Sequence, residues 1–351
     1  MRPIPMVERV ATDRVVPRVA LAIRDLAVQF ESEQGVVRAL DGVSFDLHAG
    51  RTLGVVGESG CGKSVTARSI LRLVDRPGRI TGGRMLLDPG TPEEVDLAAL
   101  DPESQRMRDV RGGRIGLIFQ EPMTALSVHY TVGNQIIEAV RQHSDISAAE
   151  ARNRAIELLG EVGIPRPETR ISAYPFELSG GLRQRVGIAM ALAGDPQIVI
   201  ADEPTTALDV TTQAQILSLL QRLQREKNIA LMLITHDMGV IAEMADDVAV
   251  MYLGQVVEFA PVEEVFATPR HPYTRALLRA VPSILATPRQ RLSTIGGAVP
   301  HPGSRPSGCS FHPRCVEQLG VLCREQSPRP IPPGRSGAAC FKAEQAQDAL
   351  A

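Results

Sequence analysis

Residues 52–64 read TLGVVGESGCGKS, a short apolar run that ends in a glycine-rich loop with a lysine and a serine. The run Thr52–Val56 predicts a buried strand, and helical spacing over Lys63–Val74 predicts a helix directly after the loop. This order is typical of a phosphate-binding loop, in which backbone N–H groups and a helix N-terminus surround phosphate oxygens. The expected nucleotide contacts are Gly57, Glu58, Ser59, Gly60, Cys61, Gly62, Lys63, Ser64 and Val65. Lys63 supplies a cation to the phosphates, and the Ser64 hydroxyl is a candidate Mg²⁺ ligand.

Further apolar segments follow the loop and predict a parallel sheet. Short apolar runs at Arg114–Phe119, Ile198–Ala201 and Ala230–Thr235 are separated by helical patterns over Thr131–Leu192 and Thr211–Glu226. Apolar strands that alternate with helices are typical of a parallel sheet with both faces covered, so we expect an α/β fold.

Two other local patterns are informative. Val19–Phe30 and Val36–Leu47 are rich in Val, Leu and Phe with alternating polarity, which predicts a meander of strands before the loop. Ser147 and Glu150 have the spacing of a capping box, which predicts a helix that runs to Leu159.

Bulk composition excludes several classes of protein. The chain has 351 residues, 44% of them hydrophobic, and a net charge of −2, so we expect a substantial core and no nucleic-acid partner. We find no run of 18 apolar residues that would span a bilayer. Residues 1–18 mix charges and prolines without an apolar stretch, so we expect a loose arm rather than a secretory signal.

A pair of carboxylates ends the apolar run Ile198–Ala201. Asp202 is placed to hold Mg²⁺, directly or through water, and Glu203 is placed to orient and deprotonate an attacking water. Phosphoryl transfer depends mostly on positioning and charge neutralisation, so these few groups suffice for ATP hydrolysis.

A second glycine-rich segment, LSGGLRQR at residues 178–185, opens the helical pattern that runs to Leu192. Ser179 is a good N-cap, and Gly180 and Gly181 expose backbone N–H groups at a positive helix end. One nucleotide cannot easily reach both glycine-rich sites of the same chain.

These motifs, in this order, resemble the ATP-binding cassette (ABC) ATPase family over roughly residues 20–260. The resemblance implies a P-loop NTPase with a RecA-like core, an antiparallel β subdomain and a helical subdomain at about residues 121–185. It also implies a head-to-tail dimer that sandwiches each ATP between one subunit's phosphate loop and the other's Ser179-Gly180-Gly181 segment. Leu182 stands where many cassettes have glutamine.

The same resemblance assigns roles to four further residues. Gln120 matches a glutamine that reaches Mg²⁺ and the attacking water and senses the membrane partner. Asp209 matches a loop that couples the two sites, and His236 matches a histidine that contacts the γ-phosphate. Phe30 resembles an aromatic residue that stacks on adenine, although a phenylalanine in a strand is usually part of the core.

A finer resemblance is to the ATPase subunits of bacterial dipeptide and oligopeptide importers. It is carried by FQEPMTAL at residues 119–126 and HPYTRALL at residues 271–278. It implies a second ATPase subunit, usually in a heterodimer, two membrane permeases and an external peptide-binding protein, with the chain on the cytoplasmic face of the membrane. Nickel and oligosaccharide importers share parts of these motifs, and exporters and soluble ATPases of DNA repair or translation remain alternatives.

Four of the five cysteines cluster near the C-terminus, at Cys309, Cys315, Cys323 and Cys340. Four thiolates can bind zinc or an iron–sulfur cluster, and their spacing does not choose between these or unliganded thiols. The segment GCSFHPRC at residues 308–315 resembles peptide-importer subunits that hold a [4Fe–4S] cluster, with zinc as the alternative. We therefore expect three parts: an arm at 1–18, a nucleotide-binding domain at 19–260 and a loop-rich extension at 261–351.

Overall fold

The computed structural model describes residues 17–32, 35–121, 125–281 and 294–348. Most of the expected N-terminal arm lies outside these residues, as do positions 122–124 of the importer-like segment. In the described part of the chain, none of the helices is long and apolar enough to cross a membrane.

A seven-stranded sheet forms the centre of the molecule, in the order β11-β10-β9-β3-β8-β7-β6. Strands β9, β3, β8, β7 and β6 are parallel, whereas β10 and β11 add to the β9 edge in antiparallel pairings. The predicted parallel sheet is therefore confirmed, and β9 and β10 were not foreseen. The strands are β3 (Thr52–Val56), β6 (Ile115–Ile118), β7 (Ile198–Asp202), β8 (Ala230–Ile234), β9 (Asp247–Tyr252), β10 (Gln255–Pro261) and β11 (Gly337–Ala338).

A second, antiparallel sheet has the order β2-β1-β4-β5. The predicted upstream strands are confirmed as β1 and β2, which pair with each other over most of their length. Buried side chains from this sheet and from β3 share one core cluster, so the two sheets pack together. The strands are β1 (Val19–Ser32), β2 (Gly35–His48), β4 (Gly78–Leu87) and β5 (Val95–Asp96).

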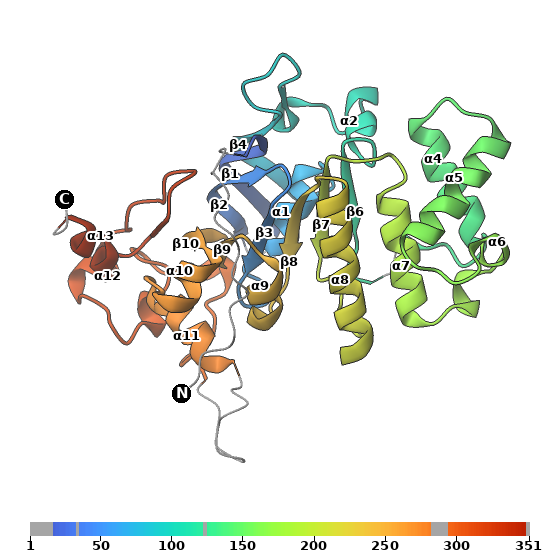
Figure 1. Ribbon diagram of the computed structural model, residues 1–351. Coiled ribbons are helices and arrows are strands. Elements are labelled where there is room, and N and C mark those ends of the chain that lie inside the picture. Colours follow the sequence, from blue (N-terminus) through green and yellow to red (C-terminus); the bar gives the residue numbers. More distant parts are fainter. Residues whose placement is uncertain (1–16, 33–34, 122–124, 282–293, 349–351) are drawn as a thin grey trace.

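Helices flank the central sheet and extend to both ends of the molecule (Figure 1). Helices α4 to α7 gather at one end, and α11 to α13 lie at the other, beside β10. The helices are α1 (Lys63–Ile70), α2 (Gln105–Val110), α4 (Val132–His143), α5 (Ala148–Glu161), α6 (Pro167–Arg170), α7 (Gly180–Ala191), α8 (Val210–Glu226), α9 (Met238–Met244), α10 (Val262–Ala267), α11 (Pro272–Ala280), α12 (Val321–Glu325) and α13 (Phe341–Asp348).

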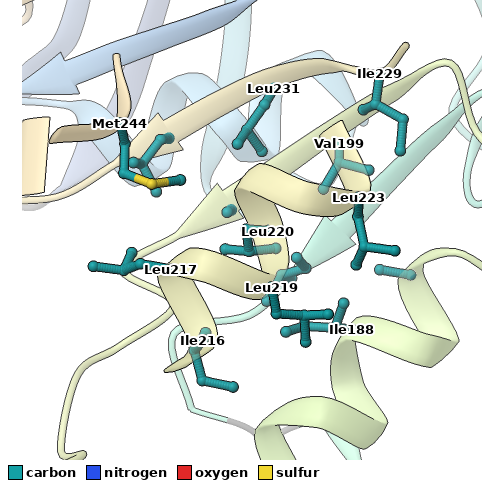
Figure 2. Close-up of a cluster of buried hydrophobic side chains, with 14 of the residues drawn as sticks. Ile188, Val199, Ile216, Leu217, Leu219, Leu220, Leu223, Ile229, Leu231 and Met244 are labelled. Carbon is teal, nitrogen blue, oxygen red and sulfur yellow. The ribbon is translucent and has the colours of Figure 1, made fainter. Parts of the chain in front are cut away.

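The core between α8 and the sheet shows why these segments are helices and strands. Leu217, Leu220 and Leu223 recur at helical spacing on one face of α8 and are at most 4% exposed. They pack near Val199 of β7 and Leu231 of β8, as Figure 2 shows. Burying each such side chain contributes about 1.5–3 kcal/mol, so this face fixes the position of α8 against the strands.

Two local predictions have different outcomes. The capping box is confirmed: the Ser147 hydroxyl accepts from the Glu150 N–H, and the Glu150 side chain accepts from the Ser147 N–H. The predicted extent of the first helix, to Val74, is wrong because α1 ends at Ile70. Arg72 adopts a left-handed φ of 55°, which a continuing helix does not allow.

Candidate functional site

The glycine-rich loop joins β3 to α1 and is held in a conformation that requires glycine. Gly62 has φ 107°, and a Cβ there would lie 2.9 Å from the Ala39 carbonyl oxygen. The Lys63 side chain is buried, and its Nζ donates to the carbonyl oxygens of Gly57 at 2.8 Å and Glu58 at 3.2 Å. The loop therefore curls around its own lysine, which can exchange these carbonyls for phosphate oxygens.

The end of β7 lies directly opposite the loop. The Ser64 hydroxyl donates to Asp202 Oδ1 at 3.1 Å. Burial raises the pKa of Asp202, and the neighbouring Glu203 adds to this effect, while the hydrogen bond from Ser64 opposes it. A hydroxyl and a carboxylate side by side are the oxygen ligands that Mg²⁺ prefers, so this pair fits the expected ion.

Glu203 is the centre of a hydrogen-bond network drawn from three parts of the chain. Gln120 Nε2 donates to its Oε2 at 3.0 Å, the Thr206 hydroxyl donates to the same oxygen at 3.0 Å, and His236 Nδ1 lies 3.2 Å from Oε1. Burial would raise the pKa of Glu203, but the hydrogen bonds from His236 and Thr206 outweigh burial and lower it. The carboxylate is thus kept ionised, as a proton acceptor must be.

The backbone at Glu203 is in the left-handed region, with φ 47°. Its N–H donates to the Ile234 carbonyl at 2.9 Å, and its own carbonyl accepts from the Thr206 N–H at 3.2 Å. Such non-glycine residues are costly and cluster at functional sites, where the surrounding structure holds them in place. Glu203 directly follows β7, and its carboxylate contacts Gln120 and His236.

The second glycine-rich segment lies at the N-terminus of α7. Ser179 is its N-cap, as expected, because the hydroxyl accepts from the Leu182 N–H. A Cβ on Gly181 would lie 2.5 Å from Thr212 Cγ2 of α8, so the glycine allows the two helices to approach closely. Asp209 caps α8 by accepting from the Thr212 N–H and hydroxyl, which places the two expected cross-dimer segments side by side.

Phe30, the expected adenine contact, is packed as part of a strand. It lies near the end of β1 and is half-buried, with its ring against Gly78 and Val74. These contacts are those of a packed strand residue, so its stacking on a base stays a prediction.

The four C-terminal cysteines line one small cavity of about 20 Å³, together with His271 and Phe311. All four are free thiols. Burial, and then the proximity of the other three cysteines, raises the pKa of Cys309 to about 11. As they stand, no three His, Cys, Asp or Glu side chains among the described residues lie close enough together to hold a metal ion. The expected cluster ligands are therefore gathered but not arranged as a finished metal site.

The structure also brings together residues whose pairing the sequence did not indicate. Arg314 forms two hydrogen bonds to the carboxylate of Glu58, and the Tyr273 hydroxyl accepts from the Glu58 N–H. Glu58 lies in the phosphate loop, and the two partners come more than 200 residues later. No local sequence pattern signals a pairing of that separation.

An apolar groove of about 240 Å³ lies beside Gln120. It is lined by Leu73, by β6 with the following Phe119, and by Met190 of α7. Phe119 is 43% exposed, although it directly follows the buried strand β6.

Comparison with known proteins places these features in a family. The model of the ABC transporter family matches residues 40–206, and the model of the oligopeptide/dipeptide transporter C-terminal region matches residues 257–323. The chain is 50% identical to a probable peptide ABC transporter ATP-binding protein of Sinorhizobium fredii, over 93% of this chain and 95% of that protein. It is 46% identical to the dipeptide transport ATP-binding protein DppD of Escherichia coli, over 88% and 91% of the two chains.

Solved structures give the same picture of the fold. The dimeric structure of MJ0796, a bacterial ABC transporter cassette, matches with a TM-score of 0.60 and 27% identity, over 69% of this chain and 98% of that one. The same cassette in a post-hydrolysis state bound to ADP and Pi matches equally well. The predicted P-loop NTPase fold is confirmed.

Proposed function

Because this chain belongs to the ABC transporter family of ATPases, we propose that it is the ATP-hydrolysing subunit of a membrane importer for dipeptides or oligopeptides. The cargo assignment is supported by the match of residues 257–323 to the C-terminal region of oligopeptide/dipeptide transporters and by the names of relatives that are 46–50% identical. The observation that carries the enzymatic assignment is the convergence of Gln120, Thr206 and His236 on Glu203.

The proposed chemistry is hydrolysis of the γ-phosphoryl group of ATP. Lys63 neutralises phosphate charge, while Ser64 and Asp202 hold Mg²⁺, which when bound offsets charge on the phosphate oxygens. Glu203 accepts the proton of the attacking water because its network keeps it ionised. Gln120 and His236 orient the carboxylate and contact the water and the γ-phosphate.

We propose that a second subunit completes each ATP-binding site. Ser179, Gly180 and Gly181 present the N-terminus of α7, a helix of 12 residues, whose free N–H groups favour an anion. Asp209 lies beside this segment and couples the two sites across the dimer. The second subunit is expected to be a related ATPase, giving a heterodimer.

The groove beside Gln120 is the proposed seat of the permeases. Its apolar lining, with Phe119 exposed at the rim, suits a short helix from a membrane partner. Gln120 contacts Glu203 and directly follows Phe119 of this groove, so we propose that a change at the nucleotide reaches the groove through these two residues. Two permeases and an external peptide-binding protein complete the importer, with this chain at the cytoplasmic face of the inner membrane.

The four cysteines are proposed to hold a [4Fe–4S] cluster, with Zn²⁺ as the alternative. Four thiols around one cavity are a suitable donor set for either. The cavity has room for about one water molecule, so the thiols would have to spread outward around a cluster. Burial is the largest cause of the raised pKa values of Cys309 and Cys315, so a bound metal would have to offset the charge of their thiolates.

Transport measurements test the function directly. The gene is deleted in its host, and uptake of a labelled dipeptide, labelled nickel and a labelled oligosaccharide is compared. We expect only peptide uptake to fall, and to return with the parent gene but not with Glu203→Gln. If nickel or oligosaccharide uptake falls instead, that substrate is the cargo. Unchanged uptake of all three substrates would contradict an importer of any of them.

A further inference from the structure

Arg314 connects the C-terminal extension to the phosphate loop. Its two terminal nitrogens donate to the two carboxylate oxygens of Glu58, at 2.6 and 3.0 Å. Its Nε donates to the Gly296 carbonyl at 3.0 Å, and its side chain is 3% exposed. The Glu58 side chain is 25% exposed, so the pair is partly shielded from solvent, and its bidentate geometry fixes both position and orientation.

A second contact holds the backbone of the same residue. The Tyr273 hydroxyl accepts from the Glu58 N–H at 2.9 Å, and Tyr273 is fully buried. Its ring packs against Tyr252 and Phe311, with centroids 4.8 and 5.3 Å away, and the Arg314 guanidinium lies 5.8 Å from the Tyr252 ring centroid. Arg314 therefore holds the carboxylate of Glu58, and Tyr273 holds its amide. Both of these residues pack against Tyr252.

These contacts matter for phosphate binding for two reasons. The carbonyls of Gly57 and Glu58 accept from Lys63 Nζ, so the position of this segment determines where the lysine lies. In addition, the Glu58 carboxylate is a negative charge in a loop that must receive a triphosphate. Arg314 cancels that charge, and its removal would leave the carboxylate uncompensated in a partly buried setting.

We propose that Arg314 and Tyr273 are positioning residues for nucleotide binding, through which the C-terminal extension shapes the phosphate loop. The inference rests on the proposed role of residues 57–64 in binding ATP. It assigns to the extension a function at the nucleotide site that is independent of what its cysteines hold.

The test compares variants of the full-length chain, prepared in the same way and with the same metal content. Arg314→Gln removes the charge, and Tyr273→Phe removes only the hydroxyl. Arg275→Gln is the matched control, because one terminal nitrogen of Arg275 donates to both carboxylate oxygens of Glu317 within the extension, at 2.8 Å each. For each variant, the Kd of a fluorescent ATP analogue, KM, kcat and Tm are measured.

We expect Arg314→Gln to raise the Kd and KM for ATP roughly tenfold, with kcat at saturating ATP changed by less than about twofold. Tyr273→Phe should raise Kd by about threefold. Arg275→Gln should lower Tm without changing Kd. In the double variant Glu58→Gln/Arg314→Gln, most of the lost affinity should return, because the uncompensated carboxylate is gone.

Two results would overturn the inference. In the first, Arg314→Gln and Tyr273→Phe bind ATP as tightly as the parent, whatever their Tm. In the second, Arg275→Gln weakens ATP binding as much as Arg314→Gln, which would mean a general loosening of the extension. If the parent chain itself binds no ATP, the proposed nucleotide site fails, and that outcome is distinct from either result.

Discussion

The side-chain amide of Gln120 donates a 3.0 Å hydrogen bond to Glu203 Oε2, although 83 residues separate the two. Gln120 follows β6 and Glu203 follows β7, and these strands are parallel neighbours in the central sheet. Their carboxyl ends therefore meet at one edge of the sheet, and Phe119, which lines the proposed permease groove, directly precedes Gln120.

Glu203→Gln should abolish most turnover and retain ATP binding. The amide keeps the shape and hydrogen-bonding capacity of the carboxylate but cannot accept a proton, so kcat should fall by roughly 10²–10⁴-fold. ATPase activity and ATP affinity measure the two effects separately. Glu226→Gln is the control, since Glu226 pairs with Arg222 on the exposed side of α8. Full activity of Glu203→Gln would remove its catalytic assignment.

Gly181→Ala should destabilise the contact between α7 and α8. The new methyl group would lie 2.5 Å from Thr212 Cγ2, and Thr212 cannot rotate freely because its hydroxyl donates to Asp209 at 2.6 Å. Overpacking of this kind costs about 1–3 kcal/mol, which thermal unfolding would detect. Thr212→Ser in the same chain removes the methyl group and should restore Tm.

The neighbouring glycine is the control for this prediction. A Cβ on Gly180 would lie 3.6 Å from Leu208 Cδ2, which is ordinary contact, so Gly180→Ala should leave Tm nearly unchanged. Equal losses of Tm in the two alanine variants would contradict the steric explanation.

His271 should make the stability of the chain depend on pH. Burial, reinforced by Arg275, lowers the pKa of His271 to about 3, from about 6.5 for an exposed histidine. Below about pH 6.5 the unfolded chain binds a proton that the folded chain does not, so stability is complete above that pH and falls by up to about 1.4 kcal/mol per pH unit below it. The loss continues down to the folded pKa.

The measurement is Tm at pH 7.5 and at pH 5.5. His271→Gln, which keeps a hydrogen-bond acceptor for the Tyr273 N–H, should reduce the pH-dependent fall in Tm by roughly 3 °C. His129→Gln changes an exposed position, so the Tm of this variant should fall between pH 7.5 and pH 5.5 as much as that of the parent. If the Tm of His271→Gln depends on pH as that of the parent does, the His271 ring is not the cause of this pH dependence.

Anaerobic purification should yield a chain with bound iron and sulfide. If the chain holds a [4Fe–4S] cluster, we expect roughly four iron atoms per chain and a broad absorption band at about 400 nm. Cys323→Ser should lose the bound iron and sulfide. Cys61→Ser should retain them, since Cys61 lies in the phosphate loop. Stoichiometric zinc without colour would favour the alternative, and absence of both metals would leave four free thiols.

The secondary structure around the candidate nucleotide site could be predicted in large part because its pieces are local. Each of the phosphate loop, the Asp202–Glu203 pair and the Ser179 cap occupies a few consecutive residues whose spacing alone specifies a strand end or a helix start. Helix boundaries were less certain: α1 stops at Ile70 because Arg72 turns left-handed, which helical spacing does not reveal. Strands β9 and β10 were missed although their core residues are buried.

By itself the sequence determined the α/β fold, the phosphate loop and the family, because buried strands, glycine turns and helix caps follow from short-range patterns. Only the tertiary structure decided which distant residues meet. It placed Gln120 on Glu203, gathered four cysteines around one cavity, and brought Arg314 to Glu58 across 256 residues. Pairings of that length depend on how the extension packs against β9 and β10, and packing is a property of the whole chain.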